Sequence, residues 1–325
     1  MTKGLEIPHD PVEGVVSFEK GDTTMAKRFV SVGECMIELS GGENRQYRMG
    51  FAGDTLNAVW YARARLGADW QTDYVTALGD DDYSTEMRAF LAANNIATGH
   101  IQTIPGRRPG LYMIRQKDGD RHFTYWRETS AARLLAEDPT ALEAAFAGAA
   151  LIYFSGITLA ILSPRARGRL LKAIVAARDA GAEIAFDPNA RPALWRSPAV
   201  MGSMTTVAAS LSTIVLPTFG DEAPVFGDKS AAETRARYMA LGVPEVVVKD
   251  GANPAHIGFN GQKLEIAPTP GEVVDATGAG DSFNGAYLAA SLEGASPAEA
   301  AAAAHRVAAV VIRHRGALVE PELVR

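Results

Sequence analysis

The sequence DATGAGDSF at Asp275–Phe283 predicts a glycine-rich turn that runs directly into a helix. Gly278 and Gly280 let the backbone turn tightly and expose consecutive N–H groups. A helix-like apolar pattern begins at Phe283, so these groups would lie at the positive end of a helix dipole, where a phosphate or a developing oxyanion binds. Asp281 in the first turn could accept a proton from a substrate hydroxyl. The stretch therefore has the parts that phosphoryl transfer to an alcohol requires, although an ordinary capped turn is the alternative reading of these residues alone.

The rest of the chain alternates strand and helix patterns. Apolar strand candidates lie at residues 29–39, 73–79, 150–156, 183–189, 213–218 and 245–251. Helix patterns lie at 55–66 and 163–180, each closed by a glycine, and a last helix opens with the capping box Ser296–Glu299. This alternation predicts an α/β fold, and the continuous apolar runs favour a mostly parallel central sheet buried on both faces.

Two segments depart from that alternation. Residues 110–127 read as two strands joined at Asp118-Gly119, a strong hairpin signal, and residues 38–49 are similarly polar and strand-like. A small sheet of this kind could close over a substrate, which a phosphoryl-transfer enzyme needs in order to exclude water.

Composition excludes several classes of protein. The 325 residues carry 32 Lys and Arg against 38 Asp and Glu, a net charge of −6 without a basic cluster, which argues against a nucleic-acid partner. The single cysteine, Cys35, excludes an internal disulfide, suits a cytoplasmic location, and is interpreted as a buried structural thiol. The sequence has no P-loop, zinc-type His/Cys spacing or nucleophile elbow, so covalent catalysis is not expected.

A membrane span is also not expected. Residues 144–162 carry no charge over a length that could cross a bilayer, but they read as a helix end followed by the buried strand LIYFSG. The N-terminus lacks the basic and apolar regions of a signal peptide. Residues 1–28 are polar and irregular, and we interpret them as an extension or as a start site placed too early, with Met25 as the second methionine.

DATGAGDSF resembles the C-terminal signature of the ribokinase-like (PfkB) carbohydrate kinases, usually D-T-x-G-A-G-D, with Ala276 in place of threonine. Three further segments resemble one branch of that family, the 2-keto-3-deoxygluconate kinases: GECMIELS (33–40), AGDTLNAVWYAR (52–63) and SGITLAILSP (155–164). RHFTYWR (121–127), FDPNARPALW (186–195) and RGALVEP (315–321) extend the likeness. It runs from about residue 29 to the C-terminus.

The resemblance implies a three-layer ribokinase-like sandwich at residues 29–325, with lid segments near 38–50 and 100–128. It implies ATP and Mg²⁺ as cofactors and transfer of phosphate to the terminal C6 hydroxyl of 2-keto-3-deoxygluconate, a step of Entner–Doudoroff metabolism. The partners would be a sugar acid and a nucleotide, with no membrane. Homo-oligomerisation stays open.

The resemblance also assigns the substrate side of the site. Tyr112, Tyr125 and Arg127 would contact the acid end from the lid, since a carboxylate invites an arginine fork. Gly53, Asp54 and Asn57 would approach the hydroxyls, with Asp281 as base and Gly278, Ala279 and Gly280 as the anion cradle. Hairpin packing is the alternative for the two tyrosines, a surface salt bridge for Arg127 and helix capping for Asp54.

The nucleotide side is assigned in the same way. Asn189 and Arg191 would face the phosphates, with Arg191 also helping to position the acid. Lys249 and Gly251 in VVVKDGANP match a strand and loop that pass the phosphates and ribose, although Pro254 departs from the usual glycine. In the family's N-x-x-E motif, associated with Mg²⁺ and phosphate, Glu222 fits the acidic position, while Phe219 replaces the asparagine; any metal contact of Glu222 would be indirect.

Two other functions remain open on the sequence. One is a ribokinase-like kinase for another sugar, such as fructose, ribose or a related keto acid. The other is a catalytically silent sugar-acid binder, against which the intact Asp281 and cradle argue.

Overall fold

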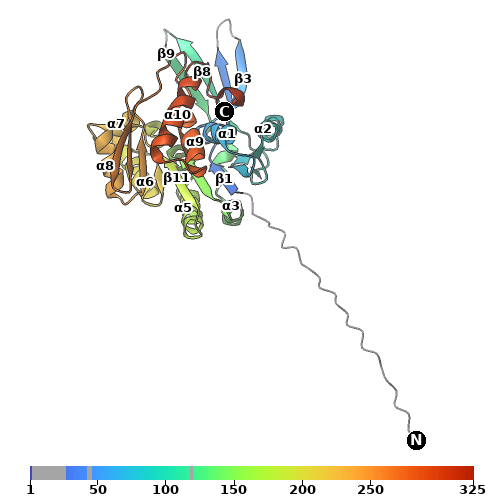
Figure 1. The fold of residues 1–325 in the computed structure, drawn as a ribbon. Helices are drawn as coiled ribbons and strands as arrows, with labels where there is room; N and C mark the ends of the chain where they lie inside the picture. Colours follow the sequence, from blue (N-terminus) through green and yellow to red (C-terminus); the bar gives the residue numbers. More distant parts are fainter. Residues whose placement is uncertain (2–26, 42–45, 118–119) are drawn as a thin grey trace.

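The computed structural model describes Met1 and residues 27–41, 46–117 and 120–325. Most of the predicted N-terminal extension and the hairpin turn at Asp118-Gly119 lie outside these residues. A large twisted sheet is covered by helices on both faces, and a smaller sheet projects from one end of this body (Figure 1). The α/β prediction is confirmed.

The central sheet has nine strands in the order β15-β14-β13-β12-β11-β10-β1-β4-β6. All neighbours are parallel except at the β13-β14-β15 edge, which is antiparallel. The strands are β1 (Lys27–Val32), β4 (Trp70–Val75), β6 (Ile96–Ala97), β10 (Leu151–Ser155), β11 (Glu183–Asp187), β12 (Ile214–Val215), β13 (Glu245–Val248), β14 (Ala255–Phe259) and β15 (Gln262–Ile266).

Helices bury both faces of this sheet, as its continuous apolar strands require. Along β10, Leu151 and Tyr153 join one core, and Ile152 and Phe154 join the other. The first core is covered by α1 (Asp54–Arg65), α2 (Asp82–Ala93), α9 (Ala279–Leu292) and α10 (Pro297–Val311). The second is covered by α3 (Pro139–Phe146), α4 (Gly156–Ile161), α5 (Pro164–Asp179), α6 (Pro198–Ser210) and α8 (Ala231–Ala240).

The helix ends follow local capping chemistry. Ser296 and Glu299 form the predicted capping box of α10, and Ser163 caps α5 with Pro164 in its first turn. The remaining helices are α7 (Phe219–Phe226) and the 3₁₀ turns η2 (Ala131–Leu134), η3 (Pro192–Leu194) and η4 (Pro321–Leu323). No helix among the described residues is both long and apolar enough to cross a bilayer.

The smaller sheet, called the lid sheet below, has the order β3-β2-β8-β9. Its strands are β2 (Met36–Gly41), β3 (Tyr47–Ala52), β8 (Gly110–Lys117) and β9 (Asp120–Trp126). The β8–β9 pair is antiparallel, as the predicted hairpin requires, and the segment predicted at 38–49 supplies parts of β2 and β3, which extend beyond it to Met36 and Ala52. Residues 100–109 precede it and contain β7 (Gln102–Thr103), which pairs with β5 (Ala77–Leu78).

Three strand predictions were wrong in extent. Residues 29–39 form two strands: β1 ends in the central sheet at Val32, and β2 starts in the lid sheet at Met36. Residues 73–79 divide between β4 and β5, and residues 213–218 contain only the two-residue strand β12. The chain leaves the central sheet after Val32, at Gly33. Gly33 packs so closely against α1 that a Cβ at this residue would lie 2.3 Å from Thr55 Oγ1.

Candidate active site

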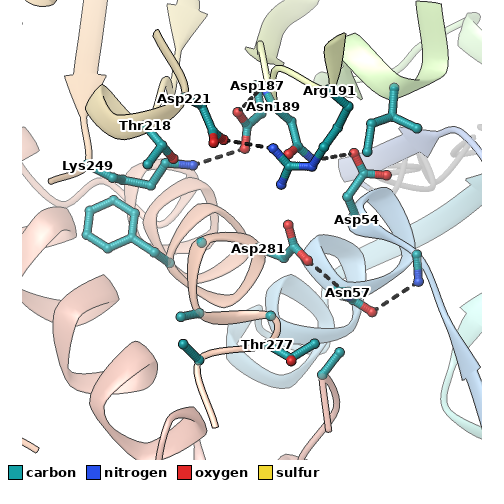
Figure 2. Close-up of a pocket in the computed structure, with 18 of the residues that line it drawn as sticks. Asp54, Asn57, Asp187, Asn189, Arg191, Thr218, Asp221, Lys249, Thr277 and Asp281 are labelled. Carbon is teal, nitrogen blue, oxygen red and sulfur yellow. Dashed lines mark hydrogen bonds and ion pairs between the residues drawn. The ribbon is translucent and has the colours of Figure 1, made fainter. Parts of the chain in front are cut away.

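A cavity of about 590 Å³ lies where the lid sheet meets the carboxyl ends of the central strands. Ligand sites in open α/β sheets form at this edge. Asp187 ends β11 and Lys249 directly follows β13, while α1 and α9 enter the cavity by their N-termini (Figure 2). The cavity is lined by all the predicted substrate, nucleotide and cradle residues: Gly53, Asp54, Asn57, Tyr112, Tyr125, Arg127, Asn189, Arg191, Lys249, Gly251, Gly278, Ala279, Gly280 and Asp281.

The predicted anion cradle is the first turn of α9. Gly278 is its N-cap with a φ of 75°, a conformation that favours glycine. Asp275 holds the preceding loop, because its carboxylate accepts the N–H of Thr277 at 2.7 Å and the N–H of Gly316 at 2.9 Å. The N–H of Ala279 donates to Ala276 O at 3.2 Å. The first-turn N–H groups of Gly280 and Asp281, which an α-helix leaves without partners, are therefore the better anion donors.

Asp281 faces the cavity from this turn, and Asn57 Nδ2 donates to its Oδ2 at 2.7 Å (Figure 2). Burial raises the pKa of Asp281 to about 7, helped by the nearby carboxylates of Asp54 and Asp187 and opposed by the Asn57 hydrogen bond and by Lys249. A carboxyl group with a pKa near neutrality suits general-base work at physiological pH.

Gly53 and Asp54 begin α1 beside the cavity. A side chain at residue 53 would collide with Glu34 O, 2.2 Å from an added Cβ. Gly53 is the N-cap and Asp54 the first helical residue, and Asp54 Oδ1 accepts the first-turn N–H of Thr55 at 2.9 Å. Its Oδ2 accepts from Asn189 Nδ2 at 2.8 Å. Burial and the Asp187 charge raise the pKa of Asp54 against three hydrogen bonds that lower it.

Lys249 is a buried cation beside the cradle. Its Nζ donates to Asp187 Oδ2 at 2.9 Å and to Asn284 Oδ1 at 2.8 Å, and it lies 3.8 Å from an ideal Cβ on Gly280. Asn284 also donates to Asp187 Oδ2 at 2.6 Å and to Tyr153 Oη at 3.1 Å. This network fixes the ammonium group where an anion in the cradle would meet it.

Arg191 lies across the cavity mouth, paired with Asp221 Oδ2 at 3.0 Å (Figure 2). Burial lowers the pKa of Arg191, but the charges of Asp221, Asp187 and Asp54 raise it by more. The net shift is upward, so the guanidinium stays charged. Asn189, two residues earlier, has a φ of 35° and donates its N–H to Asp187 Oδ1 at 2.9 Å. The DPNARP loop thus presents one cation and one amide to the cavity.

The lid sheet contributes the aromatic and basic side. Tyr112 donates to Glu38, and its ring centroid lies 5.7 Å from that of Tyr125. Burial and the Glu38 charge raise the pKa of Tyr112. The two tyrosines therefore pack within the hairpin, as the alternative reading held, and line the cavity as well.

Arg127 directly follows β9 and is only 7% exposed. Its Nη2 pairs with Glu34, whose other oxygen accepts from Ser130 Oγ at 2.6 Å. The ion pair is buried, whereas the sequence-based alternative placed it at the surface. Arg127 Nε is buried without a hydrogen-bond partner among the described residues. A buried donor in this state favours an acceptor supplied by a ligand.

Glu222 does not line this cavity, and its suggested indirect contact with a metal stays a prediction. It is fully buried on α7, where Arg237 donates to it at 2.6 Å and Tyr238 at 2.7 Å. Burial raises the pKa of Glu222 despite these two hydrogen bonds. Its Oε1 has no partner within the described ranges.

Several cavity residues were missed by sequence reasoning. Asp187 could have been found, because it lies within a predicted strand segment, two residues before Asn189. Glu34, Thr218, Asp221 and His305 carry no comparable signal: His305 sits within the alanine-rich pattern of α10, and only the packing of α10 on α9 brings it to the cavity.

Comparisons with known proteins agree with this architecture. Residues 26–322 match the family described as pfkB family carbohydrate kinase. The chain is 39% identical to the 2-dehydro-3-deoxygluconokinases of Dickeya dadantii (91% of this chain, 98% of that protein) and Escherichia coli K12 (92% and 99%).

Solved structures share the fold. A fructokinase with bound ATP from Xylella fastidiosa has a TM-score of 0.79 at 22% identity, covering 90% of this chain and 94% of that one. The 2-dehydro-3-deoxygluconokinase of Thermotoga maritima has a TM-score of 0.76 at 21% identity, covering 92% and 98%. The ribokinase-like fold prediction is confirmed, and the chain belongs to the pfkB family of carbohydrate kinases.

Proposed function

We propose that this kinase transfers the γ-phosphoryl group of ATP to the C6 hydroxyl of 2-keto-3-deoxygluconate (2-dehydro-3-deoxygluconate), giving the 6-phospho product. The observation that carries the proposal is one cavity holding both a carboxylate base at a helix N-terminus, Asp281, and a buried arginine with an unpartnered donor, Arg127. The identity to 2-dehydro-3-deoxygluconokinases over nearly the whole chain supports the same substrate.

The chemistry follows from the positions of these groups. The C6 oxygen attacks the γ-phosphorus while its proton passes to Asp281, and the bond to the bridging oxygen breaks, leaving that electron pair on ADP. The N–H groups of Gly280 and Asp281, with Lys249, face the charge on the transferring group. Arg127 holds the substrate carboxylate at the other end, and Arg191 adds a second cation.

Magnesium fits this site as an ion held mainly by the nucleotide. Among the described residues no group of three His, Cys, Asp or Glu could form a metal cage. Asp187 and Asp221 are paired with Lys249 and Arg191. When bound, Mg²⁺ neutralises charge on the bridging phosphate oxygens.

The decisive experiment is coupled ADP release by the purified chain across 2-keto-3-deoxygluconate, gluconate, fructose and ribose. We expect the keto sugar acid to have the highest kcat/KM. Preference for fructose or ribose would instead favour a kinase for a neutral sugar, and binding without ADP release would favour the silent binder.

Asp281→Asn is the matched catalytic control. It keeps the shape of the side chain but cannot accept the proton, so kcat should fall about 10²–10⁴-fold. Binding of the sugar acid, measured by calorimetry, should change far less. Near-wild-type turnover would remove Asp281 from the mechanism.

In the cell we place this reaction in the cytoplasm, in the Entner–Doudoroff breakdown of sugar acids.

A further inference from the structure

The contact between α1 and α9 is unusually close beside the catalytic aspartate. Gly285, one turn after Asp281, has no room for a side chain, since a Cβ would lie 2.2 Å from Ala58 O and 3.0 Å from Ala62 N. The two helix backbones therefore touch at this level. This approach brings Asn57, the residue before Ala58, against the Asp281 carboxylate.

The orientation of the Asn57 amide is fixed by a second contact. The N–H of Gly53 donates to Asn57 Oδ1 at 3.3 Å, and the N–H of Asn57 donates to Gly53 O at 2.7 Å. A backbone N–H can only donate, so the amide oxygen must face Gly53 and the amide nitrogen must face Asp281. Asn57 is 5% exposed, which leaves little freedom to turn the amide over.

We propose that Asn57 is a positioning residue for the reaction: its amide holds Asp281 Oδ2, turns Oδ1 toward the substrate hydroxyl and favours the ionised carboxylate. The inference rests on the proposed function and reassigns Asn57, which sequence reasoning placed against the substrate hydroxyls. One hydrogen bond to a carboxylate favours its charged form.

The charges around Asp281 explain why its hydrogen bond with Asn57 matters for ionisation. Within the described ranges, the ionisable side chains coupled to Asp281 are Asp54 and Tyr61 on α1, Tyr153 on β10, Asp187 at the end of β11 and Lys249 after β13, and His305 on α10 lines the same cavity. The two aspartates oppose ionisation of Asp281, and Lys249, already shared with Asp187, only partly offsets them. Without the Asn57 amide the pKa of Asp281 would rise above about 7.

The test is the pH dependence of kcat/KM, whose acidic limb reports ionisation in the free enzyme. Wild type should lose activity as the pH falls through about 7, the pKa of Asp281. In Asn57→Ala the limb should move up by about 1–2 pH units, as expected for losing a hydrogen bond to a charged group. The pH-dependent loss should be about 5- to 50-fold at pH 7 and small at pH 9 or above.

Two further variants keep the test clear. Asn57→Asp keeps the side-chain shape, so it guards against misfolding; its carboxyl pair with Asp281 should lose the second proton at higher pH, again moving the limb up. Asn94→Ala is the control, because Asn94 donates to Phe90 O at 2.8 Å at the end of α2, outside the cavity. Its limb should not move.

Each outcome points to one conclusion. An unmoved limb in both Asn57 variants, with KM for the sugar acid raised at every pH, would overturn the inference and return Asn57 to the substrate. If the wild-type protein releases no ADP with any sugar acid, the proposed function is wrong, and the inference about Asn57, which rests on it, fails with it.

Discussion

Arg127 is the residue on which selection of a sugar acid should depend. In Arg127→Ala the loss of a charge-assisted partner should lower kcat/KM for 2-keto-3-deoxygluconate about 10- to 150-fold, which corresponds to about 1.5–3 kcal/mol. Arg127→Lys keeps the charge but loses the planar fork, so most of the loss should remain. A neutral sugar such as fructose, measured in parallel, should be affected much less.

The buried ion pair demands a control for this prediction. Arg127→Ala leaves the Glu34 carboxylate buried without its cation, which destabilises the protein whatever Arg127 does for substrate. The double variant Glu34→Gln/Arg127→Ala removes the stranded charge and should recover stability in thermal unfolding. It should not recover selectivity for the acid. Equal losses for acid and neutral sugar in both variants would mean that Arg127 only holds the lid sheet together.

For individual residues, the sequence predicted many of the side chains that lie at the cavity but not which of them pair with one another. The motifs predicted half of the residues that line the cavity, because the chemistry of phosphate and carboxylate recognition restricts residue types. The partners are different: Glu34 binds Arg127 across 93 positions, and Asn57 binds Asp281 across 224. No local pattern encodes such separations, and only the fold brings the groups together.

Among the elements, strand existence was predictable and strand extent was not. FVSVGECMIEL is apolar enough for one long strand, and nothing in its periodicity shows that the chain leaves one sheet and enters another between Val32 and Met36. Helix limits were predicted better, because Ser163 and Ser296 cap through their own side chains and need no distant partner.

The α1–α9 contact gives a prediction for a whole element. Gly285→Ala should force the helices apart, because its Cβ would lie 2.2 Å from Ala58 O. We expect a loss of about 1–3 kcal/mol in the free energy of unfolding, typical of overpacking, and a lower kcat as Asn57 separates from Asp281. Denaturant unfolding and the ADP assay measure the two effects.

Gly168→Ala is the matched control for that change. Gly168 lies inside α5 with open space around its Cβ position, so alanine should stabilise the protein by about 0.5–1 kcal/mol through helix propensity. Its activity should match wild type. A Gly285→Ala variant as stable and active as this control would show that the two helices do not need to touch.

For the whole molecule, the segments that connect the central sheet and its helices with the lid sheet meet at one residue, Glu34. Glu34 lies in the segment that connects β1 of the central sheet to β2 of the lid sheet. Its carbonyl oxygen packs against Gly53, where β3 leads into α1. Its Oε1 lies 2.8 Å from the position of an ideal Cβ on Gly110, at the start of β8. On the return from β9, Arg127 and Ser130 bind its carboxylate. The lid sheet is thus attached to the body around one buried charge, beside the cavity it covers.

The kinase body should not depend on the first 24 residues. The family match starts at residue 26, the first strand of the described residues starts at Lys27, and 92% of this chain covers 99% of the Escherichia coli K12 relative. A chain starting at Met25 should therefore keep its kcat within about twofold and its melting temperature within about 2 °C of the full-length protein, because terminal residues outside a core add little stability. Parallel ADP assays and thermal unfolding of the two chains give the comparison. A drop of about 5 °C or more, which amounts to more than 1 kcal/mol for a protein of this size, would show that the N-terminal residues dock on the kinase body and belong to its folded unit.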